Sequence, residues 1–282
     1  MPQAPPQTTP QTTPATTTGA STDADALDQL DAELHEVGAL PDNESVRNHL
    51  VNQPLIGSQC FDRNISLFIE SSRVVGLQLR QLSLSDIPES IWRFENLRTL
   101  NLAENKIQTV ADELGQLVNL TMLDLGHNQI TALPESLGQL RSLRDFLYLH
   151  DNRLIMLPSS IGQLSRLRYL NISDNQLVFL TDTLAQLGEL CDLLVERNQL
   201  EDLPASVGRL SHLSTLSLRN NRLATLPELS GLTNLQNLDL RGNRFESLPA
   251  WIASLPYLSR LDLRWNRLTK IPAGLDDVRV LL

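Results

Sequence analysis

The feature that most constrains the fold is a spacing of leucines that returns along the chain at a nearly constant interval. Residues 120–128 read LTMLDLGHN, which is the pattern L-x-x-L-x-L-x-x-N. Aligned on its first position, the pattern opens nine times, in steps of 22 to 24 residues, at Val74, Leu97, Leu120, Leu143, Leu167, Leu190, Leu213, Leu235 and Leu258. A period of this length predicts a solenoid, in which each unit buries its apolar side chains against its neighbours.

Each part of the unit predicts a local structure. Leu123 and Leu125 are two residues apart, so they point to one side of a short strand while Asp124 points to the other. Asn128 follows where the chain leaves the strand, and its amide is suited to bond backbone groups that would otherwise be unpaired. Leucine-proline pairs, as at residues 133 and 134, then turn the chain onto the far side because proline fixes φ. The asparagine recurs at Asn105, Asn152, Asn175, Asn198, Asn221, Asn243 and Asn266.

The full unit, LTMLDLGHNQITALPESLGQLRS at residues 120–142, resembles the intracellular class of leucine-rich repeats, which is found in Ras-associated scaffolds of plants and animals and in bacterial proteins. The resemblance covers about three quarters of the chain. It implies an α/β fold, a curved horseshoe with a parallel β-sheet on the concave face and short helical or 3-10 turns on the convex face. It also implies a scaffold or regulator that binds a protein partner on the concave face.

The sequence predicts three parts. Residues 1–22 are expected to be a disordered leader, because residues 2–22 have no charge and no large apolar side chain to offset the entropy of ordering. Residues 23–72 are expected to form a helical N-terminal cap. Residues 73–282 hold the nine repeats, and Leu275, Val278 and Leu282 are expected to form one face of a short closing helix.

Apolar spacing within the cap predicts three helices. The first holds Leu27, Leu30, Leu34 and Val37. The second begins near residues 42–45 and carries Val46, Leu50 and Val51. The third is expected to carry Phe61, Ile65, Phe68 and Ile69.

Repeat four is one residue longer than the others. The sequence LRDFLYLHDN has an extra residue between Leu143 and Leu147. We expect a bulge near Asp145 and Phe146, and bulges often re-aim side chains at functional sites.

Composition and motifs argue against several functions. A net charge of −10 is unsuited to a general nucleic-acid binder, and no apolar run approaches the ~18 residues of a membrane span. We find no glycine-rich phosphate loop, CxxC pair or metalloprotease motif. We therefore expect no catalytic residue, no cofactor and no metal, and a monomer rather than a dimer.

The two cysteines indicate the cellular compartment of the protein. Cys60 and Cys191 lie about five repeats apart, roughly 25 Å, which is too far for a disulfide. Two free thiols favour the cytoplasm. His127 and His150 fall at nearly matching positions of neighbouring repeats, but zinc needs three or four ligands, so we expect surface histidines.

Residues between the leucines form columns on the expected concave face. Tyr148 and Tyr169 lie near the bulge, an acidic region follows in the middle repeats, and a row of arginines with Trp265 lies toward the C-terminal end. Tyrosine, arginine and tryptophan dominate binding hot spots. The predicted partner-binding residues are Asp124, His127, Tyr148, His150, Asp151, Tyr169, Asp174, Glu196, Arg197, Arg219, Arg241, Arg260, Arg264 and Trp265.

The arginine stripe, which we define as Arg219, Arg241 and Arg264, has a plainer alternative interpretation. Asp239 and Asp262 alternate with these arginines, and such pairs belong to an ordinary solvated surface. If the stripe binds the partner, reversing its three charges to glutamate is expected to abolish binding with little change in the melting temperature.

Two further functions stay open. An uncharged leader, with only Lys106 and Lys270 beside 21 arginines, is also typical of a bacterial effector, secreted by a type III-like route into a host cytosol. High-GC coding would produce the same bias against lysine. The chain would otherwise be the substrate-recognition part of a longer ubiquitin ligase or Roco-type GTPase, with catalytic sequence beyond Leu282.

Overall fold

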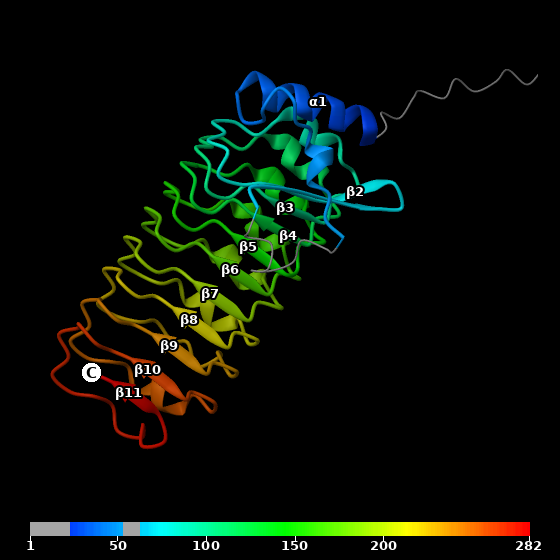
Figure 1. Ribbon diagram of the computed structural model, residues 1–282. Coiled ribbons are helices and arrows are strands. Elements are labelled where there is room, and N and C mark those ends of the chain that lie inside the picture. Colours follow the sequence, from blue (N-terminus) through cyan, green and yellow to red (C-terminus); the bar gives the residue numbers. More distant parts are fainter. Residues whose placement is uncertain (1–22, 53–62) are drawn as a thin grey trace, which may run out of the picture.

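The computed structural model describes residues 23–52 and 63–282, and these form a solenoid with one continuous sheet along its length (Figure 1). The sheet has 11 strands in chain order. Strands β2 to β11 are parallel to their neighbours, and only β1 and β2 are antiparallel. The strands are β1 Ile65–Glu70, β2 Arg73–Leu79, β3 Thr99–Asn101, β4 Met122–Asp124, β5 Phe146–Tyr148, β6 Tyr169–Asn171, β7 Asp192–Leu194, β8 Thr215–Ser217, β9 Asn237–Asp239, β10 Arg260–Asp262 and β11 Arg279–Leu281.

Short 3-10 helices follow most of the strands, and one α-helix and one 3-10 helix precede the sheet. The predicted repeat fold is confirmed. The helices are α1 Asp23–Glu36, η1 Val46–His49, η3 Glu89–Arg93, η4 Asp112–Gln116, η5 Glu135–Gln139, η6 Ser159–Gln163, η7 Asp182–Gln186, η8 Ala205–Arg209 and η9 Ala250–Ser254.

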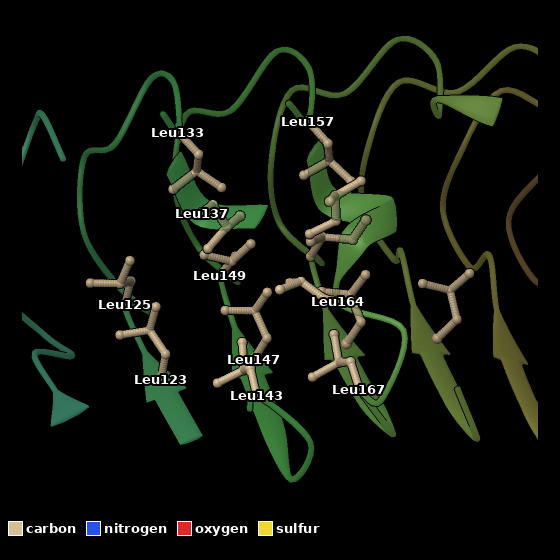
Figure 2. Close-up of a cluster of buried hydrophobic side chains, with 14 of the residues drawn as sticks. Leu123, Leu125, Leu133, Leu137, Leu143, Leu147, Leu149, Leu157, Leu164 and Leu167 are labelled. Atoms are coloured by element: carbon tan, nitrogen blue, oxygen red, sulfur yellow. The ribbon is translucent and has the colours of Figure 1, made fainter. Parts of the chain in front are cut away.

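The core is a rod of leucines between the strands and the 3-10 turns. Figure 2 shows Leu123, Leu125, Leu147 and Leu149 pointing from neighbouring repeats into this layer, and all four are fully buried. Burial of apolar surface is the dominant stabilising contribution to a fold. Because each repeat covers the apolar side chains of the next, a single repeat is not stable without its neighbours.

The recurring asparagines bond the backbone as predicted. Asn152 donates from Nδ2 to the carbonyl oxygens of Leu125 (2.9 Å) and Leu149 (3.1 Å), and its Oδ1 accepts the N–H of Ile130 at 2.9 Å. The residue just before each asparagine has a left-handed φ of 47° to 64°. The same bonding recurs at Asn105, Asn128, Asn175, Asn198, Asn221, Asn243 and Asn266. We call this series the asparagine ladder.

The cap departs from the prediction at its third helix. Helix α1 forms with Leu27, Leu30 and Leu34 buried, but it ends before the exposed Val37. The second predicted helix is only the short η1, which ends before residues 50 and 51. The third prediction is wrong, because its described part is strand β1, which pairs with β2 and closes the first edge of the sheet. The apolar run also alternates with period two, which is the strand alternative that short runs leave open. Phe61 and the leader lie outside the described residues.

The prediction of a closing helix is also wrong. Residues 279–281 form β11, which pairs with β10, and the N–H of Leu263 donates to the carbonyl oxygen of Leu281 at 2.8 Å. Leu275 is buried and Val278 packs against the core, as the apolar spacing required. The unpaired edge of β10 favours a strand here because it offers backbone partners that a helix would leave unused.

Candidate interaction surface on the concave face

Five rings touch one another at the centre of the sheet, on the side that faces away from the leucine core. We call His127, Phe146, Tyr148, His150 and Tyr169 the aromatic patch. Ring centroids lie 5.2 Å apart for Tyr148 and Tyr169, 5.5 Å for Phe146 and Tyr169, and 4.7 Å for the two histidines. Spacings in this range are favourable for aromatic pairs. The patch joins predicted site residues of repeats three, four and five.

Phe146 joins the patch from the longer repeat four. Phe146 pairs with Met122 across β4 and β5, and the extra residue lies just before it, where the N–H groups of both Arg144 and Asp145 point at the carbonyl oxygen of Thr121. Phe146 was not among the predicted binding residues. The irregular spacing was the signal that pointed to it.

Gly126 lets His150 lie against the sheet. A Cβ atom on Gly126 would come within 2.5 Å of Cε1 of His150, so a side chain there would displace the ring. Burial lowers the pKa of His150, and the charge of His127 lowers it further. The edge of the patch is fixed by His127, whose Nδ1 lies 2.5 Å from Oδ2 of Asp151.

Asp124 lies beneath the patch and is 5% exposed, whereas the sequence placed it in an open acidic region. Its Oδ1 accepts the N–H of Gly126 at 2.9 Å. Burial raises the pKa of this carboxyl group to about 6. No cation of the described residues lies within ion-pairing distance of it.

The rest of the predicted acidic region is paired. Asp151 contacts His127, and Asp174 accepts hydrogen bonds from Nε and Nη2 of Arg197. These exposed pairs contribute little stability. The region therefore carries less free negative charge than the sequence implied.

The arginine stripe is also paired with neighbouring acidic side chains. Arg219 lies 2.7 Å from Glu196. Arg241 bridges Asp239 and Asp262, and Nη2 of Arg264 lies 2.8 Å from Oδ2 of Asp262.

Asp262 is the buried centre of this network, with a side chain 1% exposed. Arg260 approaches the same carboxylate at 3.5 Å. Burial alone would raise the pKa of Asp262, but the hydrogen bonds of Arg264 and the charge of Arg241 outweigh it and lower that pKa. Asp262 therefore stays ionised inside the sheet because these arginines lie beside it.

Reversal of the stripe is therefore expected to affect folding as well as binding. Arg241→Glu leaves the buried Asp262 facing a second carboxylate, and we expect a loss of about 2 kcal/mol in the free energy of unfolding, or roughly 4–8 °C in melting temperature. Thermal unfolding followed by circular dichroism measures it. The control is Arg244→Glu, whose side chain is exposed and should leave the melting temperature unchanged. Equal shifts for both variants would contradict the network.

Trp265 stands out at the C-terminal end of the face. It is 71% exposed and has a φ of 61°, and the guanidinium carbon of Arg264 lies 5.7 Å from its ring centroid. A hollow of about 240 Å³ between the stripe and the patch is bordered by Glu196, Arg241 and Arg260. The surface thus offers a central aromatic contact and a distal indole.

The described residues contain no group of three side chains placed to hold a metal ion. No helix within residues 23–52 and 63–282 has the length and apolarity to cross a membrane. Cys191 is a free thiol, and Cys60 lies outside the described residues.

Sequence profiles of known families match most of the repeats. The family described as "Leucine-rich repeat region" matches residues 62–196, and the family described as "Leucine rich repeat" matches residues 190–245 and 211–268. A comparison with curated protein sequences gives no match.

Solved structures with the same fold include bacterial and plant proteins. The leucine-rich repeat protein LIC12759 of Leptospira interrogans aligns with a TM-score of 0.67 and 33% identity over 71% of this chain and 52% of its own. The ectodomain of the Arabidopsis thaliana receptor kinase GASSHO1/SCHENGEN3, in complex with CASPARIAN STRIP INTEGRITY FACTOR 2, aligns with a TM-score of 0.63 and 30% identity. This alignment covers 74% of this chain and 25% of the receptor chain. The plant peptide hormone receptor RGFR1, in complex with RGF2, aligns with a TM-score of 0.58 and 25% identity, over 70% of this chain and 37% of the receptor chain.

The chain spans about half of the Leptospira protein and a smaller share of the plant receptors. What these proteins share with it is the repeat unit and the way that unit stacks. On the profile matches and the repeat structure, the chain belongs to the leucine-rich repeat family.

Proposed function

We propose that the protein is a non-enzymatic interaction module, a scaffold or regulator that binds one protein partner on its concave face. The observation that carries this proposal is the aromatic patch, which is half-exposed at the centre of the sheet. The fold does not need rings there, because Thr99, Thr215 and Asn237 hold the position of Tyr169 in other repeats. Rings of this kind commonly dominate the binding energy of protein interfaces.

The similar plant receptors support the choice of ligand class. Two of them were solved in complex with CASPARIAN STRIP INTEGRITY FACTOR 2 and RGF2, and the second is a peptide hormone receptor. We propose a protein or peptide ligand for this chain on the same basis. The net charge of −10 disfavours nucleic acid as the partner, and we propose a monomer as the binding unit.

Affinity capture with two baits tests the proposal. Tyr148→Ser combined with Tyr169→Ser removes the centre of the aromatic patch, and we expect at least about tenfold less partner to be retained. The control bait is Tyr257→Ser, because this tyrosine is 64% exposed and lies outside the strands. It should retain the partner like the wild type. Equal retention by all three baits would remove the concave centre from the proposal.

The second candidate is an effector that acts inside a host cell. It is favoured by the two lysines beside 21 arginines, because few lysines leave few sites for ubiquitination. The same capture, run in parallel with lysate of the source organism and of a candidate host, separates the candidates. A patch-dependent partner from the organism itself supports the scaffold, and one found only in the host supports the effector. We propose the cytosol as the compartment in both cases, given the free thiol of Cys191.

A further inference from the structure

Asp124 carries a charge that its hydrogen bond does not require. At the same place in other repeats, Asn101 accepts the N–H of Ala103 at 2.9 Å, and Asn171 accepts that of Ser173 at 3.1 Å. A neutral amide therefore satisfies this backbone group as well as a carboxylate does.

Other aspartates at this place have a counter-ion two residues on. Asp239 accepts the N–H of Arg241, Asp262 accepts that of Arg264, and each arginine also pairs with the carboxylate it bonds. The residue two positions after Asp124 is Gly126, which has no side chain. Among the described residues, Asp124 thus has no cation paired with its buried carboxylate, and the charges of Arg80 and His127, which act from farther away, lower its pKa less than burial raises it.

One oxygen of this carboxylate stays available. Oδ1 is occupied by Gly126, whereas Oδ2 accepts no hydrogen bond within the described part of the chain. Tyr148 is the direct neighbour of Asp124 across β4 and β5. A ligand that reaches the ring of Tyr148 from the concave side therefore also approaches this oxygen.

Negative charge lies close to both tyrosines of the patch. Burial raises the pKa of Tyr148, and the charge of Asp124 raises it further. Burial raises the pKa of Tyr169 to about 12, with added contributions from Tyr148 and from Asp192, its partner in β7. Aromatic ring faces are themselves negative, so carboxylates and rings act in the same direction.

We propose that Asp124, Tyr148 and Tyr169 form a receptor for a cationic side chain, arginine or lysine, of the bound partner. The assignment rests on the proposed function and names the chemistry that its central contact selects. A cation above the rings gains from the ring quadrupole and neutralises Asp124. An apolar or acidic side chain would instead bury further a carboxylate that has no paired cation, which is costly. Asp124 therefore serves binding and not folding.

Selection of random 12-residue peptides displayed on phage tests the receptor directly. The wild-type protein is the target, and Asp124→Asn is the counter-selection. We expect arginine or lysine at a fixed position of the enriched peptides. Changing that residue to glutamine in a synthetic peptide should weaken binding to the wild type by about tenfold, measured by fluorescence polarisation, and binding to Asp124→Asn by less than about twofold. Exchange of arginine and lysine in the peptide shows which cation is preferred.

The controls separate this inference from the proposed function. Asp112→Asn removes an exposed acid on η4 and should bind the peptides like the wild type. Peptides that need Tyr148 and Tyr169 but bind equally well to Asp124→Asn would overturn the receptor and leave the proposed function standing. Peptides indifferent to all three residues would count against both. Absence of any enrichment over the counter-selected protein would also overturn the receptor.

Discussion

Replacing Asn152 with alanine is expected to lower the free energy of unfolding by about 3–5 kcal/mol, because the buried backbone groups of Leu125, Leu149 and Ile130 lose their partner. For a domain of this size the melting temperature should fall by roughly 10 °C. Urea unfolding followed by circular dichroism gives the measurement.

Asn119→Ala is the matched control for this variant. Its Nδ2 also donates to a backbone carbonyl, that of Glu95 at 2.8 Å, but the side chain is exposed and water replaces the bond. We expect a change of less than about 0.5 kcal/mol. If both variants lost the same stability, the asparagine ladder would not be a main support of the stack.

Asp124→Asn is expected to stabilise the protein, by about 3 kcal/mol at pH 7.5. The folded-state pKa of about 6 lies above the unfolded value, so the folded protein holds this proton more tightly. Stability contributed by the protonated carboxyl is therefore fully present below the unfolded pKa of roughly 4 and is lost as the pH rises to about 6. Asparagine keeps the hydrogen bond to Gly126 without the charge, as Asn101 does for Ala103.

The pH dependence is the decisive part of this prediction. Urea unfolding of both proteins between pH 4 and pH 7.5 should give a difference that grows with pH and levels off above about 6. The control is Asp112→Asn, which removes an exposed carboxyl group and should leave the free energy of unfolding within about 0.5 kcal/mol of the wild type. A difference that is constant with pH would mean that Asp124 is not buried as a charge.

The repeats could be predicted because the sequence of each repeat is enough to indicate its local structure. The leucines, the asparagine and the turn recur at fixed spacing, so a local pattern defines both the strand and what it packs against. The two ends of the sheet were mispredicted for a physical reason. Residues 65–69 and 275–282 fit a helical spacing, but each segment lies beside an unpaired edge of the sheet. Each segment forms a strand because its backbone pairs with that edge.

The site was predictable only in part. Tyr148, Tyr169 and the exposed Trp265 follow from their place in the repeat. The burial of Asp124 does not, because it depends on Gly126 and His150 from two different repeats meeting over one carboxylate. The pairing of Arg241 was foreseen as an alternative, but the burial of Asp262 beneath it required the stacked geometry.

The stacked strands also act as a ruler for any ligand. Neighbouring strands lie ~4.8 Å apart, so Tyr148 on β5 and Asp239 on β9 are separated by roughly 19 Å, the length of about six residues of extended chain. A ligand that crosses the strands must therefore carry its contacts at multiples of one strand spacing. Gain or loss of a whole repeat between β5 and β9 would change that length by one fixed step while leaving the chemistry at both ends intact.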